Sequence, residues 1–328
     1  MSAGPVRIGL RPPHAVFRGA PGTLQALVGR AEDGGLDRLC VGDHVSFRGG
    51  AGNDGLIEAT ALAALSRRLT IATSVFQLPL RHPVPVARQV ATLAGLAPGR
   101  FEFGVGVGGE DRAEVRMCGV DPSTRGARMD ESLAIVRRLL AGEEVTFSGE
   151  HFALDGARLL PPPDPAVPVV VGGRSAAALD RVARLGDGWS AVWVSPRRFA
   201  EATEQIAATA AAHGRRPSEW RHGLQVWCAF AAEEDVASTR LTQAMEGFYG
   251  IPFESFARYC PAGPPEKVAE ALVPYLDAGC RDINLIAVAE TWEETVDGAI
   301  RVRELLSGDG PFPTTGSGVP RGPAVLAR

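Results

Sequence analysis

The stretch LTIATSVFQLPLRHPVPVARQVATLAGLAPGRFEFGVGVGG at residues 69–109 decides the fold, because it carries a complete strand–helix–strand pattern. Thr70–Phe76 is a short apolar and β-branched run, which predicts a buried strand. Prolines in the PVP at 83–85 suit a first helical turn, and apolar residues then recur at helical spacing until a Pro-Gly pair. Arg100–Val107 is a second apolar run. A crossover helix between two buried strands indicates a βαβ unit with parallel strands.

The same alternation continues on both sides of this stretch. The predicted strands, in chain order, are Val6–Leu10, Leu36–Gly42, Thr70–Phe76, Arg100–Val107, Pro168–Val171, Gly188–Val194, Gly223–Ala231 and Asp282–Val288. Each is followed by a segment with helical spacing, and Thr23 is the expected N-cap of the first helix. Glu143–Pro163 alternates apolar and polar residues and predicts a hairpin inserted before the fifth strand.

Short parallel-type strands that alternate with helices predict an α/β fold, a (β/α)8 TIM barrel forming one domain over residues 1–307. The tail at 308–328 has little to bury and is expected to be mobile. A doubly wound open sheet is the rival, since GVGVGG at 104–109 resembles the dinucleotide pattern GxGxxG. No acidic residue follows about 20 positions later at another strand end, as a ribose site would need. The barrel is therefore favoured.

Composition narrows the functional classes. The 328 residues carry a formal net charge of −4, which gives no electrostatic footprint for nucleic acid or for an anionic membrane. No apolar run reaches the roughly 18 residues of a membrane span, and no signal peptide is recognisable, so a cytoplasmic enzyme is expected. The cysteines are scattered without a CxxC pair, and no His, Asp or Glu set has ligand spacing. Neither a disulfide framework nor a metal site is therefore expected.

In a barrel, catalytic groups collect where the strands end at their carboxyl side. The candidates selected by this position are Asp43, His44, Ser74, Val75, Gly106–Glu110, Gly172–Ser175, Trp193, Ser195, Cys228, Phe230 and Ala287–Glu290. A serine hydrolase is not indicated, because the GxSxG pattern is absent.

Two of these positions have both a functional and a structural interpretation. His44 beside Asp43 could act as a general acid or base, or it could be a structural histidine. Gly172–Ser175 lies at a strand-to-helix junction, where backbone N–H groups and the helix dipole favour a phosphate. An ordinary tight turn with Ser175 as N-cap explains that sequence equally well. For His82, before Pro83, a helix-capping role is favoured.

Three motifs together resemble the bacterial luciferase-like monooxygenase superfamily of flavin- and deazaflavin-dependent oxidoreductases. They are VGDH at Val41–His44, the stretch Thr70–Gly109, and PVVVGGRSAAALDRVARLGDGW at Pro168–Trp189. The likeness extends from about Val6 to Leu306. VGGRS followed by ARLGDGW is most similar to the branch that uses coenzyme F-420, a hydride-carrying deazaflavin, and less similar to the branch that uses FMN.

The resemblance implies roles for individual residues. His44, next to Asp43, would face the redox-active ring as general acid/base, and Glu110 lies where some members carry an acidic proton donor. A cis peptide at Ser74–Val75 would support the back of the ring. Gly106, Val107, Gly108 and Gly109 would let the cofactor approach closely, and Gly172, Gly173, Arg174 and Ser175 would take its phosphate. The extra glycine at Gly109 makes the alignment of Glu110 uncertain by one residue.

We therefore expect hydride transfer between coenzyme F-420 and a small organic substrate, in a homodimer as the resemblance implies. The alternatives are an FMN-dependent monooxygenase supplied by a flavin reductase, and a sensor that holds a flavin without turnover. Substrate choice is expected to lie in Gly49–Gly55, Glu143–Pro163 and Phe248–Tyr259. The aromatic residues of the last segment would form a pocket wall or lid, or simply pack on the barrel or a second subunit.

Overall fold

The computed structural model describes residues 4–108, 111–217 and 219–307. Within these ranges, eight parallel strands close into a barrel, because β7 pairs with β10 and the last strand pairs with the first. The barrel strands are β1 (Arg7–Leu10), β2 (Arg38–Val41), β5 (Thr70–Thr73), β7 (Phe101–Gly106), β10 (Val169–Gly172), β11 (Gly188–Val192), β12 (Gly223–Phe230) and β14 (Asp282–Val288). The predicted TIM barrel is confirmed.

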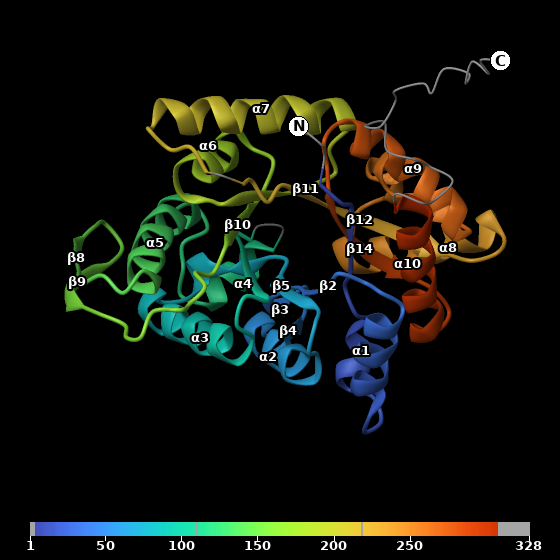
Figure 1. The fold of residues 1–328 in the computed structure, drawn as a ribbon, viewed down its shortest axis with the longest axis horizontal. Coiled ribbons are helices and arrows are strands. Elements are labelled where there is room, and N and C mark those ends of the chain that lie inside the picture. The colour runs from blue at the N-terminus through green and yellow to red at the C-terminus, as the bar shows by residue number, and fades with distance from the viewer. Residues whose placement is uncertain (1–3, 109–110, 218, 308–328) are drawn as a thin grey trace, which may run out of the picture.

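Helices alternate with the strands along the chain, and most of them surround the barrel on the outside (Figure 1). They are α1 (Thr23–Asp33), α2 (Gly55–Leu65), α3 (Pro83–Leu96), α4 (Arg112–Met117), α5 (Arg125–Leu140), α6 (Ala176–Leu185), α7 (Pro196–Ala212), α8 (Glu234–Tyr249), α9 (Pro265–Asp277) and α10 (Trp292–Leu306). The first and last of these are neighbours, joined by an ion pair between Arg30 and Asp297. None of the helices in the described ranges is long and apolar enough to cross a membrane.

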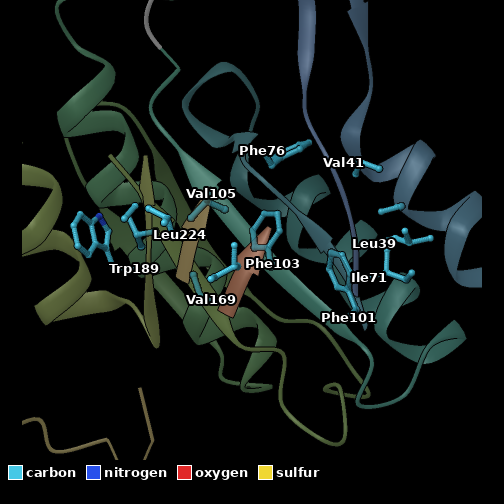
Figure 2. Close-up of a cluster of buried hydrophobic side chains, with 14 of the residues drawn as sticks. Leu39, Val41, Ile71, Phe76, Phe101, Phe103, Val105, Val169, Trp189 and Leu224 are labelled. Carbon is cyan, nitrogen blue, oxygen red and sulfur yellow. The ribbon is translucent and has the colours of Figure 1, made fainter. Parts of the chain in front are cut away.

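The core lies between the barrel strands and the inward faces of the helices. Figure 2 shows part of it, with Phe76, Phe103 and Trp189 among the fully buried side chains. The Phe76 and Phe103 ring centroids are 5.6 Å apart, and Trp189 stacks on Phe199 of α7 at the same separation. Each large side chain buried in this way contributes about 1.5–3 kcal/mol. The core therefore fixes the strands whose ends carry the candidate site.

Several local predictions need correction. The N-cap of α1 is Gly22 in a left-handed conformation, and no side chain caps this helix, so Thr23 is its first residue. The predicted third strand is interrupted at Ser74–Val75 and resumes as β6 (Phe76–Gln77), which pairs with β7. The Gly49–Gly55 loop is partly a hairpin of β3 (His44–Phe47) and β4 (Ala51–Asn53). The polar segment after Gly109 contains α4, which was not predicted.

Other local predictions agree with the structure. The insertion before the fifth strand is an antiparallel hairpin of β8 (Val145–Ser148) and β9 (Ala153–Ala157), which projects beside α5 in Figure 1. The His82 ring caps α3, since its Nδ1 accepts the Val84 N–H at 3.3 Å. The remaining short elements are β13 (Ala262–Gly263), which pairs with β12, and the 3-10 turns His14–Phe17, Leu78–Leu80, Phe253–Ser255 and Ala257–Tyr259. The tail 308–328 lies outside the described residues.

Candidate active site

A cavity opens at the carboxyl ends of the barrel strands. Its lining residues are Arg11, Gly42, Asp43, His44, Ser74, Val75, Gln77, Gly106, Val107, Gly108, Gly172, Gly173, Ser190, Val192, Trp193, Gln225, Trp227, Phe248, Tyr249 and Ile286. The structure thus brings the predicted residues of the second, third, fourth and fifth strands to one place. We call this space the mouth cavity.

His44 is held by a carboxylate that the sequence did not point to. Its Nδ1 lies 3.0 Å from Oε2 of Glu114 in α4, and Oε1 of Glu114 accepts the N–H of Val45 at 2.6 Å and of Ser46 at 3.1 Å. Because an ionised carboxylate only accepts, His44 Nδ1 carries the hydrogen of this bond. Nε2 is then the ring nitrogen that remains available for proton exchange.

The Glu114 side chain is 2% exposed, so its charge state matters. Burial raises the pKa of Glu114, but hydrogen bonds from His44 and from the Ser46 N–H outweigh burial and hold the pKa below its ordinary 4.5. Gln77 adds a fourth donor, with Nε2 at 3.3 Å from Glu114 Oε2. The carboxylate is therefore ionised at neutral pH and orients the His44 ring.

Asp43, the sequence neighbour of His44, has a different environment. Its fully buried carboxylate accepts hydrogen bonds from Nη1 and Nη2 of Arg81, at 2.7 and 2.8 Å. It also accepts hydrogen bonds from the backbone N–H groups of Gly55 and Gln77. Burial raises the pKa of Asp43, and the Arg81 charge opposes that shift. These bonds join the segment after β2 to β6, to the segment that precedes α3 and to the start of α2. The geometry thus favours a role in positioning His44 over direct proton transfer.

Val75 forms the floor of the mouth cavity. The Ser74–Val75 peptide is cis, as the resemblance implied. Two glycines make room for the Val75 side chain, since a Cβ at Gly106 would lie 2.5 Å from Val75 Cγ2 and one at Gly172 would lie 2.9 Å from Val75 Cγ1. Gly108, at φ +66°, passes beside Gln77 in a conformation that favours glycine. Glycines at these positions keep the floor low enough for a flat group.

The turn before α6 is compatible with both interpretations of Gly172–Ser175, the capped tight turn and the phosphate site. Ser175 is the N-cap, and its Oγ accepts the Ala178 N–H at 3.2 Å. The indole N–H of Trp189 donates to Gly173 O at 2.6 Å and fixes the turn. The first N–H groups of α6 have no partner within the helix, and Ser175 and Arg174 are exposed beside them. An anion can therefore bind at a correctly capped helix.

Two buried polar atoms in the wall of the mouth cavity have no hydrogen-bond partner among the described residues. They are Oε1 of Gln77, an acceptor, and Nε1–H of Trp193, a donor. Nε2 of Gln77 donates to Asp43 O at 2.8 Å, so the amide orientation is fixed and the acceptor is the unpaired atom. Such atoms are costly to leave unpaired. A ligand with both donor and acceptor groups would satisfy them.

Aromatic residues form one side of the mouth cavity. Phe248 and Tyr249, at the end of α8, line it together with Trp227 and Trp193. Phe256 packs on the Trp193 ring with centroids 4.5 Å apart and is 6% exposed. The aromatic segment thus divides, because its first two rings face the cavity and the later ones pack behind them.

The residues of β12 that face the cavity were not predicted correctly, whereas Trp193, which follows β11, lines the cavity as expected. Gln225 and Trp227 face the mouth cavity, whereas Cys228 and Phe230 are buried on the other side of the strand. Ser195 caps α7 by accepting the Arg198 N–H. Arg11, Gln77 and Glu114 were missed as well, as were Ser190 and Gln225, whose side chains are joined at 2.8 Å. The predicted residues Gly109 and Glu110 lie outside the described residues.

Comparison with known proteins places the chain in a family. The model of the luciferase-like monooxygenase family matches residues 6–282. An F-420-dependent glucose-6-phosphate dehydrogenase of Nakamurella multipartita is 31% identical over 194 residues, which cover 58% of this chain and 57% of the relative. One from Beutenbergia cavernae is 37% identical over 175 residues, 52% of each protein. The match thus spans little more than half the length of these relatives.

Solved structures show the same fold. An F-420-dependent secondary alcohol dehydrogenase, in complex with an F-420–acetone adduct, superposes with a TM-score of 0.76 at 22% identity, covering 90% of this chain and 98% of the other. The monooxygenase RslO1 of Streptomyces bottropensis also gives 0.76, at 21% identity, covering 91% and 98%. The match of the family model over residues 6–282 shows that the chain belongs to the luciferase-like monooxygenase family.

Proposed function

We propose that this protein is an oxidoreductase that transfers hydride between coenzyme F-420 and an organic substrate, with His44 exchanging the accompanying proton. The observation that carries the proposal is the His44–Glu114 pair in the wall of the mouth cavity. A purely structural or sensory cavity has no need of an oriented imidazole with a free Nε2. The relatives named as F-420-dependent dehydrogenases support the choice of cofactor.

The residues present fit such a cofactor. When bound, a deazaflavin supplies or accepts a hydride in one two-electron step. Val75, seated between Gly106 and Gly172, would support its ring, and the start of α6 would hold its phosphate. Gln77 Oε1 and Trp193 Nε1–H would pair with polar groups of the ring. Glu110 remains in the proposal as a second proton donor.

His44 acts through its geometry. Glu114 accepts the Nδ1–H and stabilises the ring when it becomes protonated, so Nε2 can take a proton from a substrate hydroxyl or return it to a carbonyl. Gln77 and the Val45 N–H hold Glu114 in turn. Asp43 fixes the backbone on which His44 sits, through Arg81 and Gln77. Glu114 and Asp43 thus position the group that exchanges the proton, and Gln77 and Arg81 hold these two carboxylates in turn.

The test separates cofactor binding from proton exchange. Purified protein is titrated with coenzyme F-420 and with FMN by calorimetry, and turnover of a panel of alcohols and carbonyl compounds is followed by the cofactor's visible absorbance. Wild-type protein should bind F-420 more tightly than FMN. His44→Ala should lower kcat by about 10²–10⁴-fold, and F-420 affinity should change far less.

His213→Gln, at an exposed histidine that ends α7, is the matched control and should keep wild-type turnover. Preferred binding of FMN with product formation that requires oxygen would replace the proposal by the monooxygenase alternative. Tight cofactor binding with equal residual turnover in wild type and His44→Ala would exclude His44 from the chemistry.

A further inference from the structure

A second cavity of about 670 Å³ opens beside the mouth cavity, and we call it the annex. It lies between the loop after β1, the end of β14 and the start of α10. Its lining residues are Arg11–Val16, Gly19, Thr23, Trp227, Phe248, Ile286–Glu293 and Thr295. Arg11, Trp227, Phe248 and Ile286 line both cavities. The annex thus adjoins the mouth cavity that His44 lines, and its size suits a small organic molecule.

The annex wall is mainly apolar. Pro12, Pro13 and Val16 form one side, and the run Ile286–Ala289 forms the other, with the indole of Trp292 near the distal end. Val16 and Ala287 are buried, so this lining is part of the packed fold. A wall of this kind stabilises an apolar ligand by removing its surface from water, at about 25 cal/mol per Å².

The charges of the annex disfavour an anionic ligand. Of the described lining residues, Arg11 is the one lysine or arginine, and it lies at the junction with the mouth cavity. Glu290 and Glu293 line the annex as well, and Glu290 is paired with Arg240. The chain's single lysine, Lys267, is paired with Glu234 away from both cavities. A phosphate is normally held by several cationic side chains, and the described lining of the annex supplies Arg11 alone.

Arg11 itself has a free hydrogen-bonding capacity. Among the described residues its side chain bonds to His14, with Nη2 at 3.2 Å from Nε2, and no carboxylate of these residues pairs with it. Its guanidinium packs on Gly42, two residues before His44, so closely that a Cβ there would lie 2.1 Å from Nη2. A donor in this position can bind the oxygen of a substrate whose carbon reacts next to His44.

We propose that the annex binds the body of the substrate, and that this substrate is a neutral, mainly apolar alcohol or carbonyl compound rather than a sugar phosphate. The inference rests on the proposed function above and specifies the substrate class of that site. In the oxidising direction, the carbinol C–H bond breaks and its hydride passes to oxidised F-420. The O–H proton goes to His44 Nε2, and a carbonyl forms. Arg11 donates to the oxygen throughout.

The experiment compares two probes on the F-420-loaded enzyme. Menthol is a bulky, neutral secondary alcohol. Glucose 6-phosphate is a dianionic sugar phosphate, and it is the compound after which the relatives are named. Menthol should be oxidised with the higher kcat/KM. Ala289→Trp, which fills the annex, should raise KM for menthol about tenfold or more, while Ala211→Trp, at an exposed position of α7 outside both cavities, is the control and should keep the wild-type KM. Ala15→Trp, at an exposed lining residue, is a second filling variant in case the first misfolds.

Binding of menthol to the protein without cofactor is measured by calorimetry, so the two proposals can fail separately. One outcome is that F-420 does not bind, that menthol still binds, and that Ala289→Trp abolishes menthol binding. This outcome would overturn the proposed function and leave the annex as an apolar site. Normal F-420 binding with preferred turnover of glucose 6-phosphate would overturn the substrate class alone. Equal menthol KM in wild type and both filling variants would show that the annex does not bind the substrate.

Discussion

The two ends of the barrel are built from the same strands and differ in how their polar groups are satisfied. At the amino end, Arg38, Glu102 and Asp282 are each less than 10% exposed, and Arg38 pairs with both carboxylates. Arg7 adds two bonds of 2.7 Å to Asp282, and Arg221 approaches Glu102. This network closes the amino end of the barrel with charged side chains from the starts of several strands.

At the carboxyl end, ion pairs hold Asp43 and His44, and the Gln225 amide donates to Ser190. Gln77 Oε1 and Trp193 Nε1 have no partner there among the described residues; at the amino end Arg38 Nε and His222 Nδ1 are also unpaired, but the Arg38, Glu102 and Asp282 charges are paired. The unpaired atoms at the mouth line a cavity in which a ligand can complete them, whereas the ion pairs at the amino end join the strand starts without a ligand. The comparison indicates that substitutions at the amino end should affect stability, and that substitutions at the mouth should affect binding and turnover.

The largest effect is expected from Asp282→Ala. It leaves Arg7 and Arg38 without their shared partner, and breaking a buried ion pair costs about 3–5 kcal/mol. Urea unfolding should show this loss, while the F-420 affinity of the folded fraction stays at the wild-type value. Asp297→Ala, at an exposed ion pair with Arg30, is the control and should lose much less. A large loss of cofactor affinity in folded Asp282→Ala would break the division between the two ends.

His222 directly precedes β12 at the amino end of the barrel, and the pH dependence of stability tests its role there. Burial lowers the pKa of His222 to about 4, from 6.5. Between these values the unfolded chain binds the proton and the folded one does not, so stability falls as pH decreases from 6.5 towards 4. His222→Phe, which can keep the stacking on Trp220, should remove about 2–3 kcal/mol of this dependence. Unfolding curves at several pH values would show it, and an unchanged slope would contradict it.

Gly106→Ala tests the mouth. The new Cβ would meet Val75 Cγ2 at 2.5 Å, so the floor of the cavity must move, at a cost of about 1–3 kcal/mol. F-420 affinity should fall about tenfold or more by calorimetry, an effect of similar size. Gly95→Ala, in α3 with open space around its Cβ, is the matched control and should bind normally. Equal affinity in the two variants would mean that Val75 does not support the cofactor.

Glu114→Gln is expected to have the smallest effect on stability, about 1–2 kcal/mol at neutral pH, because charge-assisted hydrogen bonds become neutral ones. The pKa of Glu114 is lowered in the folded state, so this deficit should be complete above 4.5 and vanish as pH falls through the lowered value. Its kcat should fall while F-420 affinity is retained. A pH-independent deficit would contradict an ionised Glu114.

The sequence by itself determined the elements and their order. Hydrophobic runs of strand length alternate with helical spacing, and these patterns depend on residues that are neighbours in the chain. Glycines at Gly106 and Gly172 and the histidine after the second strand could be placed at the barrel mouth for the same reason, since strand ends meet there. The insertion hairpin and the cap at His82 also follow from local residues.

Only the tertiary structure decided which side chains meet. Glu114 is separated from His44 by 70 positions and lies on a helix that has no clear periodicity, so nothing local connects the two. Which residues of β12 face the cavity depends on how the closed barrel sets the alternation, and Trp227, not Cys228, faces inward. The annex exists because the first and last units of the barrel become neighbours on closure. Contacts across the closure are set by packing, which local sequence patterns do not encode.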